Sequence, residues 1–220
     1  GDPSVTLTVL GPRLIRHNGA LAYPWFDGSD TAGSHTVNGH SVVFRLDCGN
    51  VRMLFPGDVN IEGSEHLLGI AGFAAQAQAH VLKAPHHGSH EFKREFLDAV
   101  QPQITVISSG DDRDHGHPRP SFLGYVGMAS RSTEPLVYST ELAGNFRVVS
   151  GPTAESTSTP PPARADPAHA SEIGQARVFF HRYLNGMINV RTDGNVVHAA
   201  RRVVAPYQFI TEQLAPAPPH

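Results

Sequence analysis

The regular alternation of short apolar strands with helical segments constrains the fold of this chain more than any other feature. Strands are predicted at residues 4–12, 41–59 (a hairpin that turns at residues 47–50), 79–85, 103–110 and 135–140. Helices are predicted at residues 61–78, 91–100 and 120–130, and a long loop at residues 13–38. Strands and helices that alternate through short connections are typical of a layered α/β fold.

The composition changes after this alternating region. Residues 151–172 contain almost no large apolar side chain, so a linker or mobile loop is expected there. Strand-like alternation returns at residues 173–210 with a turn at Asp193–Gly194, and so short a pair of strands is expected to pack on the preceding domain. Residues 211–220 are expected to form a disordered tail. The first domain is therefore predicted to span residues 1–150.

Charge and cysteine content exclude several classes of protein. The net charge of −3 does not favour broad electrostatic binding to long nucleic acid, although a local basic groove is compatible with it. The single cysteine, Cys48, excludes an internal disulfide framework and a zinc site built from several thiolates. No apolar run approaches 18 residues, so no membrane segment is predicted, and no signal peptide is recognised. The 14 histidines nearly equal the 17 lysines and arginines, which directs attention to metal binding.

Histidines and carboxylates gather where the predicted strands end. Asp58 follows the strand in MLFPGDVN, and His86 and His87 follow the strand in VLKAPHHGS. His117 lies after the next strand, and His40 lies just before the hairpin. Carboxylate and imidazole groups without thiolate suit Zn²⁺ or Mn²⁺, and a carboxylate between histidine-rich loops suits a site with two metal ions. For each cluster alone, the alternatives are a helix N-cap for Asp58 and a solvated loop for the histidine pair.

These motifs together resemble a known superfamily. The combination of FPGD, HHGS and a following GHP, each next to an apolar strand, is similar to the second half of the metallo-β-lactamase fold over residues 4–150. Within that superfamily, the chain most resembles the ComEC-type branch, which comprises the nuclease-like domain of a bacterial DNA-uptake channel protein and its free-standing relatives. The resemblance implies an αββα sandwich to which this chain contributes mainly the second half.

The resemblance also implies roles for individual residues. Asp58 matches the metal-bridging aspartate and His87 the last metal-binding histidine, with His86 as the competing choice. His40 occupies the place of a middle metal-binding histidine, with Asn38 as the alternative. His117 matches the histidine that binds phosphate or protonates the leaving group; Ser89 and Lys83 are further candidates for contact with substrate, although Lys83 also fits a surface lysine.

One part of the superfamily pattern has no counterpart in the sequence. The His-x-(His/Asp)-x-Asp-His motif of the first half is absent, and DDRDHGH at residues 111–117 does not replace it because it follows HHGS. We therefore expect an N-terminal half or a partner chain to complete the domain, since half a sandwich would expose one face of its sheet.

The resemblance implies a metal-dependent hydrolase, and in particular a phosphodiesterase or nuclease that uses a metal-activated hydroxide and two Zn or Mn ions. Its substrate would be a nucleic acid or a nucleotide, and its expected location is the bacterial cytoplasm. Two alternatives remain. One is a non-catalytic binding subunit of a larger assembly, and the other is an acyl or lactone hydrolase of the same fold.

Overall fold

The computed structural model describes residues 4–26, 34–109, 116–150, 176–203 and 209–213. The chain forms two compact units, residues 1–140 with 186–220, and residues 141–185. No helix among the described residues has the length and apolar character needed to cross a membrane.

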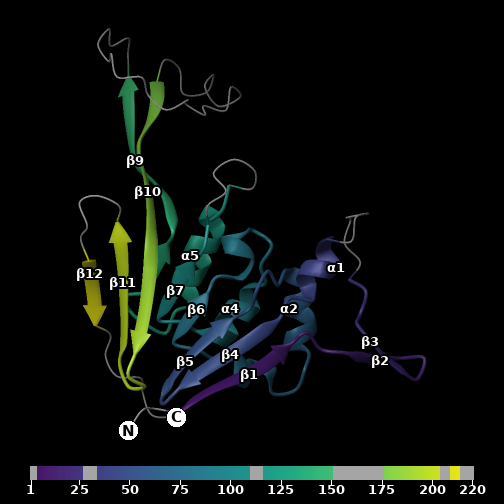
Figure 1. Ribbon diagram of the computed structural model, residues 1–220. Coiled ribbons are helices and arrows are strands. Elements are labelled where there is room, and N and C mark those ends of the chain that lie inside the picture. The colour runs from purple at the N-terminus through teal and green to yellow at the C-terminus, as the bar shows by residue number, and fades with distance from the viewer. Residues whose placement is uncertain (1–3, 27–33, 110–115, 151–175, 204–208, 214–220) are drawn as a thin grey trace. The chain divides into compact units, whose positions relative to one another are not determined.

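A six-stranded sheet organises the first unit (Figure 1). Its strand order is β1-β4-β5-β6-β7-β8. β4 pairs antiparallel with both β1 and β5, whereas β5, β6, β7 and β8 are parallel neighbours. The strands are β1 (Val5–Gly11), β4 (Val43–Cys48), β5 (Val51–Phe55), β6 (Val81–Lys83), β7 (Ile104–Ile107) and β8 (Leu136–Ser139). The predicted α/β class is confirmed, while the αββα sandwich stays a prediction.

Helices pack on one face of this sheet and bury the main core. They are α2 (Ile61–Leu68), α3 (Phe73–Ala77), α4 (Arg94–Val100) and α5 (Pro120–Ala129). Phe96 and Phe122 from the helices are buried in one cluster with Leu54, Leu82 and Ile107 from the strands. This packing fixes the ends of β5, β6 and β7 beside one another, which is where the polar clusters of the sequence lie.

Strand β11 and the end of β10 pack on the other face of the sheet. The strands described after residue 175 are β10 (Ala176–Thr192), β11 (Val197–Val203) and β12 (Phe209–Gln213). Val197 and Ala199 of β11 are buried in a second cluster with Met53, Val81 and Ile104. At the edge strand β1, Val5, Leu7 and Val9 are exposed on alternate positions.

The structure differs from the predicted loop at residues 13–38. This stretch contains a hairpin of β2 (Ile15–His17) and β3 (Ala20–Ala22), followed by helix α1 (Ser34–Gly39). The hairpin turns at Asn18 and Gly19, whose φ angles of 49° and 82° are those that Asn-Gly adopts in a two-residue turn. The prediction of a loop was wrong here, because Asn18 and Gly19 form a tight turn that lets the flanking residues pair as a hairpin.

The helix predicted at residues 61–78 is interrupted. It forms α2 and α3, separated by a short connection that ends at Gly72. Gly72 has a φ angle of 81°, which is outside the helical region and is easily adopted only by glycine. The four-residue turn 69–72 therefore ends one helix and starts the next.

The second unit contains a long antiparallel ribbon. β9 (Glu141–Ser150) pairs with the first part of β10, with Glu141 opposite Asn185 and Ser150 opposite Ala176. The division between compact units thus differs from the predicted boundary at residue 150. The predicted linker, residues 151–172, lies outside the described residues. Residues 211–213 of the predicted tail lie in β12, and residues 214–220 are not described.

Candidate active site

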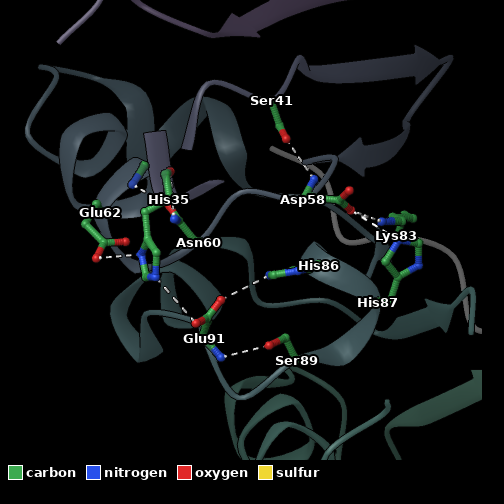
Figure 2. Close-up of polar contacts among 11 residues, drawn as sticks. His35, Ser41, Asp58, Asn60, Glu62, Lys83, His86, His87, Ser89 and Glu91 are labelled. Atoms are coloured by element: carbon green, nitrogen blue, oxygen red, sulfur yellow. Dashed lines mark hydrogen bonds and ion pairs between the residues drawn. The ribbon is translucent and has the colours of Figure 1, made fainter. Parts of the chain in front are cut away.

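Asp58 and His87 meet at the ends of two neighbouring parallel strands. Asp58 follows β5, and His87 lies in the 3₁₀ turn η1 (Pro85–Gly88) that follows β6. Oδ1 of Asp58 is 3.4 Å from Nε2 of His87 (Figure 2). The sequence predicted both residues as metal ligands, and the structure brings them together.

The ring of His87 is held by a hydrogen bond to the end of a third strand. Its Nδ1 lies 2.6 Å from the carbonyl oxygen of Ser108, which follows β7. Because a carbonyl oxygen only accepts, Nδ1 carries the proton and donates it. A metal-binding histidine commonly donates its second ring nitrogen to a carbonyl in this way, which fixes the ring and its tautomer.

The Asp58–His87 pair fits part of a metal coordination shell. With the proton on Nδ1, a neutral His87 points the lone pair of Nε2 at a carboxylate oxygen, so the contact is favourable only with a proton or a cation between the two atoms. Two ligands of a tetrahedral zinc ion with bonds of about 2.0–2.1 Å lie about 3.3–3.4 Å apart. The observed 3.4 Å matches one edge of such a tetrahedron.

Two donors do not make a complete metal site. Within the described part of the chain, no group of three or more histidine, cysteine, aspartate or glutamate side chains is arranged to hold a metal ion. The pair therefore needs further ligands from elsewhere before it could hold a metal tightly.

Lys83 also faces Asp58. Its Nζ donates to the carbonyl oxygen of Gly57 at 3.1 Å and lies 3.6 Å from Oδ1 of Asp58. Burial lowers the pKa of Lys83, and the nearby Asp58 carboxylate partly opposes this effect. The structure therefore places Lys83 in the site, in contact with the proposed metal ligand.

The turn before Asp58 requires a glycine. Gly57 has a φ angle of 63°, and a Cβ atom there would lie 2.8 Å from Cβ of Ser41. The hydroxyl of Ser41 accepts a hydrogen bond of 2.9 Å from the backbone N–H of Asp58. The close approach of Ser41 thus fixes the backbone that carries the carboxylate.

The backbone of η1 is strained where it carries the histidines. His86 and His87 have φ angles of 41° and 53°, which are uncommon for residues other than glycine. The N–H of His86 donates to the carbonyl oxygen of Gly57 at 3.1 Å, which ties this turn to the turn before Asp58. Such strain persists only where surrounding contacts hold it, and it is concentrated at functional sites.

His86 faces away from Asp58, toward a second network of polar side chains (Figure 2). Its Nδ1 is 3.5 Å from Oε2 of Glu91, whose other oxygen is 3.8 Å from Nε2 of His35. Nδ1 of His35 is in turn 3.1 Å from Oε1 of Glu62. The pKa of His86 is lowered, chiefly by burial, although the nearby Asp58 and Glu91 carboxylates act in the opposite direction. Of the two competing histidines, His87 is the one that faces Asp58.

The GHP loop lies against η1. The ring centroids of His117 and His86 are 5.7 Å apart, and the N–H of Arg119 donates to the carbonyl oxygen of Gly88 at 2.8 Å. A Cβ atom on Gly88 would lie 2.9 Å from Cβ of Pro118, so only glycine allows this approach. His117 is thereby brought beside the histidine pair.

His40 and Ser89 make other contacts. Nε2 of His40 donates to the carbonyl oxygen of Pro24 at 2.7 Å, and its ring stacks on Phe26. Ser89 is only 3% exposed, and its hydroxyl accepts a hydrogen bond from the N–H of Glu91. No contact among the described residues joins His40 to Asp58 or His87, and Ser89 organises the turn after η1.

Sequence reasoning missed three residues that shape the site. Glu91 was assigned only to a helix, Ser108 to the end of a strand, and Ser41 to the start of a hairpin. Ser108 and Ser41 act through a backbone carbonyl and a short hydroxyl, for which no sequence signal exists. The N-cap interpretation of Asp58 is wrong, because Asn60 caps α2 and accepts from the N–H of Gly63.

Comparisons with known proteins find two proteins to which part of this chain is similar. The chain is 39% identical over 82 residues to "Competence protein ComA" of Neisseria gonorrhoeae, which covers 37% of this chain and 12% of that protein. It is 30% identical over 87 residues to "ComE operon protein 3" of Bacillus subtilis (strain 168), which covers 39% of this chain and 11% of that protein. The chain thus matches about an eighth of the length of these relatives. No protein-family profile and no solved structure match it.

Proposed function

We propose that this chain supplies one side of the active centre of a metal-dependent phosphodiesterase that acts on nucleic acid or a nucleotide. The observation that carries the proposal is the approach of Nε2 of His87 to Oδ1 of Asp58 at 3.4 Å. Nδ1 of the same ring is hydrogen-bonded to the carbonyl oxygen of Ser108. Two acceptor atoms held face to face by rigid strand ends are what a divalent cation requires.

Each residue has a defined task in this proposal. Asp58 and His87 hold the cation, and Ser41 and Ser108 keep these two side chains in position. A bound divalent cation would supply the Lewis acid that activates water and neutralises charge at phosphorus. His117, beside His86, would protonate the leaving oxygen. The remaining metal ligands would come from other polypeptide.

A nucleic acid or nucleotide is the favoured substrate class because the combination of FPGD, HHGS and GHP resembles a nuclease-like branch. Part of the chain is also similar to "Competence protein ComA" and "ComE operon protein 3". The alternative of a non-catalytic subunit is favoured by one observation, the lack of a third metal ligand among the described residues.

The test compares Asp58→Asn and His87→Ala with His90→Ala, which removes an exposed histidine close by. Mn²⁺ binding is measured on the 220-residue chain by electron paramagnetic resonance. Mn²⁺-dependent cleavage of single-stranded DNA and of bis(p-nitrophenyl) phosphate is measured on the natural polypeptide that contains this chain. We expect both site variants to lose binding and cleavage, and His90→Ala to retain them.

The results distinguish the two functions. Full cleavage by either site variant contradicts the assignment of the site. A natural polypeptide that folds but contains no Zn or Mn by elemental analysis, and cleaves neither substrate, supports the non-catalytic subunit instead.

A further inference from the structure

Lys83 is held inside the candidate site instead of extending into solvent. It is the last residue of β6, and its side chain is 21% exposed. Its ammonium group donates to the carbonyl oxygen of Gly57 and faces the carboxylate of Asp58. Both partners belong to the turn after β5, so Lys83 joins the ends of two strands.

The ammonium group and the imidazole of His87 approach the same oxygen atom. Oδ1 of Asp58 lies 3.6 Å from Nζ of Lys83 and 3.4 Å from Nε2 of His87. A cation held between Asp58 and His87 would therefore be a close neighbour of the positive charge on Lys83. Like charges this close repel strongly in a half-buried site, where water screens them less than it does at the surface.

The contact between Lys83 and Asp58 stabilises the carboxylate when no metal is bound. The side chain of Asp58 is 41% exposed and lies beside groups fixed at the strand ends, so water compensates only part of the cost of leaving this carboxylate without a counter-charge. Lys83 supplies that charge from within the chain and keeps the carboxylate directed at His87. Contact with substrate, the role predicted from the sequence, would require the ammonium group to leave both of its present partners.

From this geometry we infer that Lys83 is the resident counter-ion of Asp58 and weakens divalent-cation binding by the Asp58–His87 pair. The inference rests on the proposed function, because it concerns the same two ligands. Lys83 is thus a positioning residue that stabilises the metal-free site. The complete site must supply enough further negative ligands to outweigh the charge of Lys83.

The test measures Mn²⁺ binding by the 220-residue chain with electron paramagnetic resonance, and does not depend on catalysis. Lys83→Met removes the charge and keeps the side-chain length, and it should tighten Mn²⁺ binding on the order of tenfold. Lys83→Arg keeps the charge and should bind Mn²⁺ as weakly as the natural chain does. Lys93→Met removes the lysine that precedes α4 and pairs with Glu65 of α2, and it should leave Mn²⁺ binding unchanged.

Circular dichroism establishes that each variant is folded, and Lys83→Gln takes the place of Lys83→Met if the latter does not fold. Unchanged or weaker Mn²⁺ binding by the charge-removing variant overturns the inference, provided that Asp58→Asn still abolishes binding. If Asp58→Asn instead leaves Mn²⁺ binding intact, the proposed function fails and the inference falls with it.

Discussion

Nδ1 of His87 lies 2.6 Å from the carbonyl oxygen of Ser108, although 21 residues separate them along the chain. This contact determines which ring nitrogen carries the proton. We expect His87 to adopt the Nδ1–H tautomer at about pH 9, where unperturbed imidazoles are neutral. Long-range ¹H–¹⁵N correlation spectra of the imidazole rings measure the tautomer directly.

His66 provides the internal control for this measurement. Its Nε2 lies 3.2 Å from the carbonyl oxygen of Arg13, so it should show the opposite tautomer, Nε2–H, in the same spectrum. An Nε2–H tautomer at His87 would mean that the lone pair does not face Asp58, and would remove the basis for metal binding by that nitrogen.

Gly88→Ala should separate the two histidine loops and destabilise the fold. The added Cβ would lie 2.9 Å from Cβ of Pro118, and Gly88 has a φ angle of 77°. We expect the free energy of unfolding to fall by about 1–3 kcal/mol, measured by urea denaturation. Gly124→Ala in helix α5 is the matched control, because nothing lies within 4 Å of its Cβ position. It should raise the free energy of unfolding by about 0.5–1 kcal/mol.

Asn60→Ala should weaken the start of α2 and its link to α1. Asn60 is 1% exposed; its side-chain oxygen accepts from the N–H of Gly63, and its side-chain nitrogen donates to the carbonyl oxygen of His35. Loss of both bonds should lower the free energy of unfolding by about 1–2 kcal/mol. Asn60→Asp keeps the cap oxygen but buries a charge and turns a carboxylate oxygen toward the carbonyl oxygen of His35, so it should also be destabilising. Urea denaturation of both variants measures the two effects.

The lowered pKa of His86 predicts a stability that decreases in acid. The unfolded chain takes up a proton on His86 near the ordinary histidine pKa of 6.5, whereas the folded chain takes it up only at lower pH. The free energy of unfolding should therefore fall as the pH drops below 6.5 and on through the pKa of the folded state. His86→Gln should reduce this slope in urea denaturation at several pH values. His90→Gln, the exposed control, should leave it unchanged, and equal slopes for all three proteins would contradict the prediction.

The sequence was sufficient to predict the strands that carry the site and the Asp58–His87 pair. Parallel strands place their carboxyl ends side by side, so polar residues after β5, β6 and β7 had to converge. The choice of His87 over His86 came from the family resemblance, because strand topology alone does not decide which of the two faces Asp58. That depends on the left-handed backbone of η1. Adjacent residues in a tight turn point in different directions, and only the φ and ψ angles decide which of them faces Asp58.

Other features depended on contacts between residues far apart in the chain. The stacking of His40 on Phe26 and its bond to Pro24 arise from packing of the stretch before α1. The partnership of Glu91 with both His86 and His35 joins three separate segments. Neither periodicity nor motif spacing carries information of this kind. By contrast, the Asn18–Gly19 hairpin was encoded locally and could have been predicted.

The carbonyl oxygen of Gly57 accepts hydrogen bonds from both the backbone of His86 and the ammonium group of Lys83. One atom is thus the common reference point for the two turns that carry Asp58 and His87. If HHGS is transplanted onto another scaffold without the FPGD turn, the histidines lose the carbonyl oxygen of Gly57 that holds their turn in place. The smallest portable unit of this site is the pair of turns together with the lysine at the end of β6.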